Sequence, residues 1–109
     1  RRVGDVMIVD ATGRMTRNEG YGMAKQRITE LVEEGHHDLL LNLADVSYMD
    51  STCVGELVSA FITTRSKGGK LKLARTTGRI KKLLTVARLD TVFEVFDTED
   101  EAIESYSRS

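Results

Sequence analysis

Residues 40–57 read LLNLADVSYMDSTCVGEL, and they are the most informative part of the chain for its fold. An apolar run leads into a short polar connection, and Asp50, Ser51 and Thr52 then precede apolar residues at helical spacing. Those apolar positions are Val54, Leu57, Val58, Phe61 and Ile62. The pattern predicts a strand buried on both faces, a loop that crosses the sheet edge, and an amphipathic helix that begins at Ser51.

Ser51 lies where the predicted helix begins, and two interpretations of it stay open. Asp, Ser and Thr are preferred N-cap residues, and the hydroxyl would then serve only to cap the helix. Alternatively, the helix dipole and the unpaired N–H groups of the first turn tolerate an anion, which makes Ser51 a candidate phosphoacceptor. A phosphate there would add about −1.5 to −2 charges and change the surface without unfolding the helix.

Strand and helix patterns alternate on both sides of this stretch. Short apolar or alternating runs predict strands at residues 6–9, 38–43, 70–74 and 92–96, with Val3 as the stub of an earlier strand. A turn is expected at residues 10–13, after the first of these runs.

Helical spacing predicts three further helices, at residues 18–34, at residues 78–87 and after Thr98. The first and last follow capping-box patterns, Thr16 with Glu19 and Thr98 with Glu101. Alternation of this kind predicts one α/β domain over residues 1–109, with a mostly parallel sheet and right-handed crossovers.

Composition excludes several classes of protein. The chain has 109 residues, of which 40% are hydrophobic and 30% charged, as in a soluble globular domain. A formal net charge of −1 gives no overall attraction to nucleic acid or to an anionic membrane. No apolar run approaches the roughly 18 residues of a membrane span. The single cysteine excludes an internal disulfide, and a reducing cytoplasm is the expected compartment.

Other candidate functional residues are interpreted without assigning them a catalytic or metal-binding role. Cys53 lies near a helix start, where a thiol pKa can fall, but no anion-binding loop follows it, so a small packed side chain is expected. Gly55 indicates either close approach of a neighbouring strand or a flat surface for a partner. His36 and His37 are expected to be solvated, with no metal site. No Gly-rich phosphate loop occurs, and no cofactor is expected.

The most basic region is also expected to be solvated. Residues 67–82 contain seven lysines and arginines, which we assign to exposed faces of a strand and a helix. No aromatic residues interleave with them to stack bases, so we expect no binding of nucleic acid.

The order of these motifs resembles a known family. Residues 42–55, NLADVSYMDSTCVG, resemble the segment around the phosphorylated serine of bacterial anti-sigma factor antagonists, which are STAS domains. The resemblance continues at residues 13–15 and from residues 68–71 to residues 83–84 and 92–93. It implies a STAS-like sheet of four to five mostly parallel strands, with about four helices packed mainly on one side.

The resemblance also implies a partner-switching function. An unphosphorylated antagonist binds an anti-sigma factor that is also a serine kinase, and this frees the sigma factor. Phosphorylation of the antagonist ends the complex, and a serine phosphatase restores it. The implied protein is bacterial and cytoplasmic, a monomer or weak dimer, and a binding module with no enzymatic activity and no direct membrane insertion.

The implied site combines two segments of the chain. Ser51 is the phosphoacceptor, and the partner-binding residues are Asp50, Thr52, Cys53, Gly55, Gly13, Arg14 and Thr16.

Two positions depart from the family pattern. Cys53 stands where the family usually has Gly, and Thr16 stands where it often has Asp, so Arg14 would instead meet the phosphate. The alternative function is a STAS scaffold or regulatory domain of a larger assembly, such as a stress-signalling complex, an anion transporter tail or a lipid-transport complex.

Overall fold

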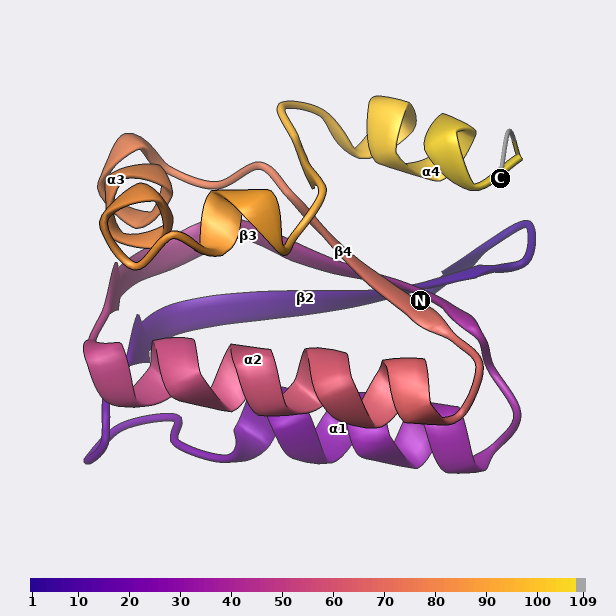
Figure 1. Cartoon of the computed structure of the whole chain (residues 1–109), viewed down its shortest axis with the longest axis horizontal. Coiled ribbons are helices and arrows are strands. Elements are labelled where there is room, and N and C mark those ends of the chain that lie inside the picture. The colour runs from indigo at the N-terminus through magenta and orange to yellow at the C-terminus, as the bar shows by residue number, and fades with distance from the viewer. Residues whose placement is uncertain (108–109) are drawn as a thin grey trace.

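The computed structural model describes residues 1–107 as a five-stranded sheet with four α-helices (Figure 1). In chain order the elements are β1 (Arg2–Val3), β2 (Val6–Met15), α1 (Met23–Glu33), β3 (Asp38–Met49), α2 (Ser51–Ser66), β4 (Lys70–Ala74), α3 (Gly78–Val86), the 3₁₀ helix η1 (Leu89–Thr91), β5 (Val95–Phe96) and α4 (Glu99–Ser107). The strand order is β1-β2-β3-β4-β5, and only β1 pairs antiparallel. The predicted α/β fold with a mostly parallel sheet is confirmed.

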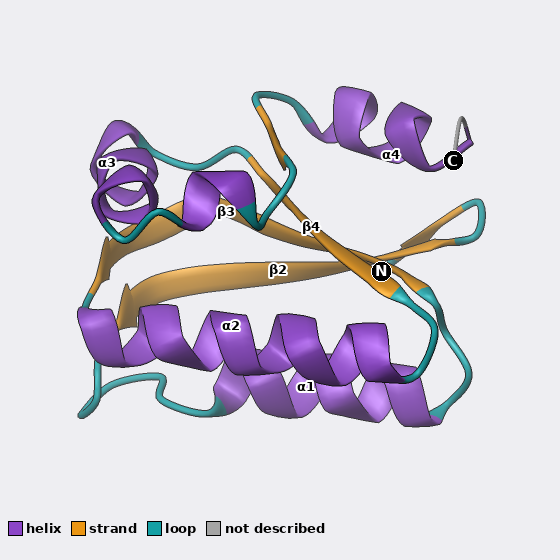
Figure 2. Ribbon diagram, viewed as in Figure 1, coloured by secondary structure: helices purple, strands orange, loops and turns teal. Residues whose placement is uncertain are grey.

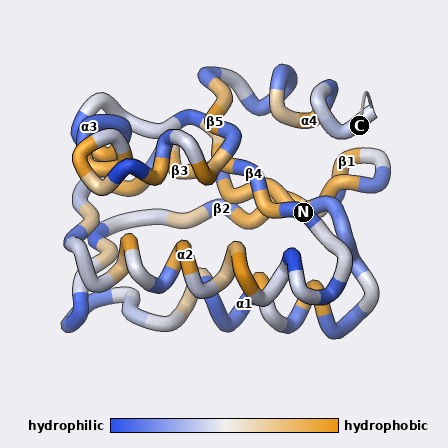
Figure 3. Tube along the Cα trace, in the orientation of Figure 1, coloured by the Kyte–Doolittle hydropathy of each residue, from blue (hydrophilic) through white to orange (hydrophobic). Residues whose placement is uncertain are grey.

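The larger core lies where α1 and α2 cover the sheet (Figure 2). Fully buried leucines of β3 alternate along it, with Leu39, Leu41 and Leu43 turned into this core and Leu40 turned to the opposite side. Helix α3 adds Ile80 and Leu84 to the same cluster. Figure 3 shows hydrophobic positions along the central strands and on the side of α2 that faces them. Three of the four described helices therefore pack into one core, as expected.

A smaller core lies under α4, on the other side of the sheet (Figure 2). Ala102 and Tyr106 of α4 are buried, and Ile103 packs beside them. Lys72 of β4 is only 2% exposed, because its ammonium donates to the Ser105 hydroxyl at 2.9 Å and lies 4.2 Å from the Tyr106 ring centroid. The assignment of all seven basic residues of this region to solvated faces is therefore wrong for Lys72.

Strand β2 is longer than the sequence pattern predicted. The turn expected at residues 10–13 is absent, and the strand continues to Met15 beside β3. Its register shifts between Asp10 and Thr12 and again after Gly13, whose φ of 79° lies in the left-handed region. Glycine adopts this conformation without steric cost, so the irregularity bends the strand without ending it.

Strand β3 also extends beyond its predicted end at Leu43. No loop separates it from Asp50, because residues up to Met49 pair with the extended part of β2. Asp45 and Ser47 are exposed while Val46 and Met49 are buried, so the polar residues occupy one face of a continuing strand. The predicted loop is therefore wrong, because a strand with one exposed face carries polar residues at alternate positions.

Helix α1 begins at Met23, five residues after its predicted start. The Thr16–Glu19 pattern forms a tight turn, in which each backbone N–H donates to the other residue's carbonyl oxygen. Gly20 and Gly22 then take φ values of 71° and 84°, which an α-helix does not accept. The predicted capping box at Thr16 is therefore wrong.

The C-terminal half follows its predictions more closely. Strand β4 and helix α3 match the predicted ranges to within one residue, and the Thr98 hydroxyl accepts from the Glu101 N–H at 3.1 Å as an N-terminal cap. The last strand is shorter than predicted, and only Val95–Phe96 pair with β4. The N–H groups of Val92 and Phe93 instead donate back to the Leu89 carbonyl oxygen of η1. Within residues 1–107, no helix combines the length and apolar character needed to cross a membrane.

Tyr106 joins α4 to the sheet through its hydroxyl. That group donates to the Leu39 carbonyl oxygen, and the Lys70 carbonyl oxygen lies 3.1 Å away. Burial raises the pKa of Tyr106 well above its ordinary value.

Tyr106→Phe should lower the free energy of unfolding by about 1 kcal/mol in urea titrations, because a buried hydrogen bond is lost. Tyr21→Phe is the control, since Tyr21 is 57% exposed; equal effects of the two changes would contradict this role.

Candidate functional site

Asp50 joins three segments at the start of α2. Its carboxylate accepts from the Cys53 N–H at 3.0 Å, which makes it the N-cap of the helix, and from the Arg17 N–H at 2.9 Å. Its own N–H donates to the Met15 carbonyl oxygen at 3.1 Å. The hydrogen bonds from Cys53 and Arg17 lower the pKa of Asp50 below its ordinary value. The end of β2, the following loop and α2 therefore meet at this carboxylate.

Ser51 is the first residue of α2 and is exposed. Its hydroxyl makes no hydrogen bond within the part of the chain that the structure describes, and Asp50 supplies the cap. The interpretation of Ser51 as the N-cap is therefore wrong. Thr52 is exposed beside it, so two hydroxyls stand at the surface of the first helical turn.

Cys53 and Gly55 lie one turn into the helix and differ in exposure. Cys53 is fully buried, and burial, followed by the nearby Asp50 and Glu56 carboxylates, raises its pKa to about 11. A thiol held protonated in this way is a poor nucleophile, so the expectation of a packed side chain is confirmed. Gly55 is exposed, and a Cβ built there meets nothing within 4 Å, so close approach of a strand does not explain this glycine.

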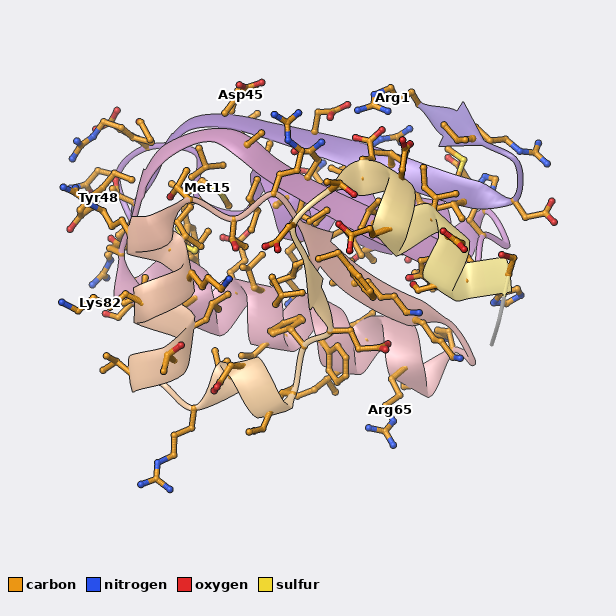
Figure 4. All side chains as sticks on the ribbon, turned by 90° about the horizontal axis from the view of Figure 1, so that it is seen from above. Arg1, Met15, Asp45, Tyr48, Arg65 and Lys82 are labelled. Carbon is orange, nitrogen blue, oxygen red and sulfur yellow. The ribbon has the colours of Figure 1, made fainter. Side chains whose placement is uncertain are left out.

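Gly13, Arg14 and Thr16 lie at the end of β2, close to α2. Gly13 pairs with Val46, and the Arg14 guanidinium lies 4.8 Å from the Tyr48 ring centroid. Thr16 closes a turn with Glu19, and within this turn the Arg17 N–H donates to the Asp50 carboxylate. The structure thus brings this predicted segment to the start of α2, and Figure 4 shows Tyr48 and Met15 at the same end of the molecule.

Glu56 is a residue of this region that sequence reasoning missed. It is 6% exposed, and its two carboxylate oxygens accept from the N–H groups of Gly22 at 3.0 Å and Lys25 at 3.1 Å. It therefore caps α1 from α2, in place of the side chain that Gly22 lacks. No signal in the sequence indicated this role, because Glu56 lies almost opposite the apolar stripe of Val54, Leu57, Val58, Phe61 and Ile62 at helical spacing.

A second polar cluster lies away from Ser51 and was also missed. The Arg1 guanidinium pairs with Asp10 at 2.8 Å and with Glu99 at 2.7 Å, and the Asn42 amide donates to Glu99 at 2.6 Å. These partners lower the pKa of Glu99 to about 2, with the Arg1 contact as the largest cause. Every charge in this cluster has an opposite partner, so we assign it a structural role.

Metal binding finds no support in residues 1–107. No three His, Cys, Asp or Glu side chains gather there as a ligand set. His36 lies 3.8 Å from the Glu34 carboxylate and is half-buried, whereas His37 is exposed as expected.

Comparisons with known proteins agree on one family. The family model described as STAS domain matches residues 1–102. A Thermotoga neapolitana protein, named as a homologue of the candidate anti-sigma factor antagonist TM1081, is 28% identical over 94% of this chain and 90% of its own length. The anti-sigma-B factor antagonist of Bacillus subtilis is 35% identical over 65% of this chain and 64% of its own length.

Solved structures share the fold. The crystal structure of TM1081 from Thermotoga maritima, also named as a candidate anti-sigma factor antagonist, superposes with a TM-score of 0.88 at 25% identity. That match covers 96% of this chain and 90% of TM1081. The STAS domain of a SulP transporter from Vibrio cholerae superposes with a TM-score of 0.78 at 15% identity, over 99% and 85% of the two chains, and this likeness concerns the fold alone.

The Glu56 cap can be tested by mutation. Glu56→Ala removes both acceptors of the α1 N-terminus, so the free energy of unfolding should fall by about 1–3 kcal/mol in urea titrations. Glu56→Gln keeps one acceptor oxygen, so its free energy of unfolding should fall less than that of Glu56→Ala. Glu30→Ala is the control, because the Glu30 side chain is 46% exposed and pairs with the exposed Arg27. A loss no larger than the control's would show that Glu56 does not hold α1.

Asp50 should make stability depend on pH. Its pKa is lowered in the folded state from a reference of 3.8, so the stability it contributes is present above about pH 4 and is lost as the pH falls. The wild type should therefore exceed Asp50→Asn in unfolding free energy at neutral pH, and the gap should narrow toward about pH 3. Asp45→Asn is the control, because Asp45 is exposed. A gap that stays constant across this range would rule out the proposed contribution.

Proposed function

The chain belongs to the STAS domain family, and from this premise we propose that it is an anti-sigma factor antagonist controlled by phosphorylation of Ser51. The unphosphorylated domain binds an anti-sigma factor that is also a serine kinase. Transfer of a phosphate to Ser51 ends the complex, and a serine phosphatase resets it. The domain itself acts as a binding module in the bacterial cytoplasm, as a monomer or weak dimer.

The observation that carries this proposal is the state of the Ser51 hydroxyl. It is exposed, lies at the first position of α2, and is not engaged in capping because Asp50 performs that role. A kinase can therefore reach the hydroxyl without breaking a hydrogen bond of the fold. The helix dipole tolerates a phosphate at this position.

The same geometry supports binding residues around Ser51. Asp50 and Thr52 flank it along the chain, Gly55 leaves an open surface one turn later, and Arg14 and Thr16 come from the end of β2. Cys53 is buried, so it would shape the binding surface through packing and not by direct contact. We assign Gly13 to the same region because it permits the bend of β2.

A second function has some support from the fold. The STAS domain of a Vibrio cholerae SulP transporter has the same architecture, so this chain would alternatively be a scaffold or regulatory domain of a larger assembly without a phosphoswitch. Under that alternative, Ser51→Glu leaves binding to the partner unchanged. Under the proposed function, Ser51→Glu weakens binding to the anti-sigma factor.

Ser51→Ala is the direct test of the phosphoswitch. The wild-type domain should gain the mass of one phosphate when it is incubated with ATP and a serine kinase of the anti-sigma factor type from the same genome. Ser51→Ala should gain none, because the acceptor hydroxyl is gone. Ser47→Ala is the matched control, since Ser47 is exposed nearby on β3 and should leave the gain intact. A phosphate retained on Ser51→Ala would refute the assignment.

A further inference from the structure

Two arginines from different elements share one aromatic ring beside the proposed phosphosite. The guanidinium carbon of Arg14, on β2, lies 4.8 Å from the Tyr48 ring centroid, and that of Arg79, on α3, lies 5.8 Å from it. Tyr48 itself is half-buried on β3. Each contact has the geometry of a cation–π interaction, so the ring holds both cations at one place on the surface.

Most of this positive charge is not neutralised inside the domain. Among the residues that the structure describes, Arg14 pairs with one carboxylate, that of Glu19 at 3.3 Å. Arg17 and Arg79 are exposed, and neither makes an ion pair with any residue in the range 1–107. The Asp50 carboxylate is occupied by the backbone N–H groups of Arg17 and Cys53. Two like charges on one ring repel each other in the isolated domain, and an added negative group would relieve this repulsion.

This charge gathers at the end of β3, after which Asp50 and Ser51 begin α2. Tyr48 is three residues before Ser51, and the Arg17 backbone is bonded to Asp50, which caps the helix that Ser51 begins. Figure 4 shows Tyr48 at the same end of the molecule as Lys82, whereas Arg65 lies away from it. We call the surface formed by Arg14, Arg17, Arg79 and Tyr48 the arginine face.

Exposed apolar side chains lie on the α1 side of the same region. Tyr21 is 57% exposed and Met23 is 69% exposed, and the segment that carries them is tied to α2 by the hydrogen bond from Gly22 to Glu56. Met23 also lines a groove of about 310 Å³ between β2 and α1. Tyrosine, methionine and arginine are the residues enriched in protein–protein interfaces.

We propose that the arginine face binds an acidic surface of the partner protein, and that a phosphate on Ser51 weakens this contact by offsetting the same arginines. The inference rests on the proposed function, because it concerns the partner of the surface around Ser51. The partner's carboxylates pair with Arg17 and Arg79, and its apolar residues cover Tyr21 and Met23. The phosphate adds about −1.5 to −2 charges within this surface and competes with those carboxylates.

An acidic protein surface fits better than nucleic acid. The chain has a formal net charge of −1, so no extended positive field draws a polyanion. Tyr48 is already occupied by two guanidinium groups and offers no open platform for a base. The exposed Tyr21 and Met23 require an apolar counterpart, which a folded acidic protein surface provides.

The test uses a synthetic peptide of glutamates with one central phenylalanine, followed by amide NMR spectra of the 109-residue chain. Peptide addition should shift amide signals of residues 13–18, 48–52 and 79, and rising salt should reverse the shifts. Arg17→Glu and Arg79→Glu should each weaken binding about tenfold, since an attraction becomes a repulsion. Arg65→Glu is the matched control, because Arg65 is exposed at the far end of α2 and should change binding less than about twofold.

The remaining outcomes are equally decisive. Ser51→Glu should weaken peptide binding, whereas Thr63→Glu, on the same helix, should not. Equal losses for Arg65→Glu and Arg79→Glu would reduce the effect to overall charge and overturn the proposal. Tighter binding of a 20-nucleotide oligothymidine than of the peptide would also overturn the proposal. Amide shifts that depend on protein concentration alone would do the same, because they would indicate binding to a second copy of this chain.

The experiment separates this inference from the proposed function, because peptide binding needs no kinase. If Ser51 is phosphorylated but the peptide does not bind at the arginine face, the inference fails and the phosphoswitch stands. If the peptide binds there but Ser51 accepts no phosphate from a kinase, the phosphoswitch fails and an acidic-partner surface without a switch remains.

Discussion

The carboxylate of Asp50 is the contact on which the geometry around Ser51 depends. It accepts from Cys53 in α2 and from Arg17 in the loop after β2, while its N–H donates to Met15. A single ionised group thus sets where the helix starts and where the loop lies against it. Because Asp50 performs the capping, Ser51 carries none of this structural duty, and its hydroxyl is left at the surface. An exposed hydroxyl at the helix start is therefore one whose modification breaks no hydrogen bond of the fold.

Features set by local chemistry were predicted from the sequence, and features set by distant partners were not. The alternation of Leu71 and Leu73 and the Thr98–Glu101 cap lie within single elements, and both were predicted. The Thr16–Glu19 pattern was misread, because Glu56 caps α1 from another helix and leaves Thr16 to form a turn. The predicted lengths of β2 and β3 were too short for a related reason. The outer part of β3 is stable only because the bent end of β2 pairs with it, and no run of apolar residues signals such pairing.

The candidate site likewise combines features that the local sequence predicts with contacts that only the folded chain creates. Asp50, Ser51 and Cys53 are consecutive or nearly so, and their positions at a helix start followed from hydroxyl and acidic residues preceding an apolar helical pattern. The cluster around Tyr48 could not be predicted in this way, since Arg14 and Arg79 come from β2 and α3 and meet only in the folded chain. The burial of Lys72 against Tyr106 is a further contact of this kind. Counting charges along the chain predicts one basic region at residues 67–82, whereas the fold buries Lys72 and leaves the other basic residues on the surface.

The proposed switch follows from how charge is distributed about the start of α2. A phosphate on Ser51 would stand next to the Asp50 carboxylate, and this repulsion alone would weaken the cap. The exposed arginines at residues 14, 17 and 79 oppose it, because they supply positive charge close by, and among residues 1–107 only Arg14 has an ion-pair partner, Glu19. The cap can then survive phosphorylation while the net charge of the surface changes sign. On this argument the domain does not need to change its conformation to release a partner, since the same arginines that attract the partner's carboxylates would be engaged by the phosphate.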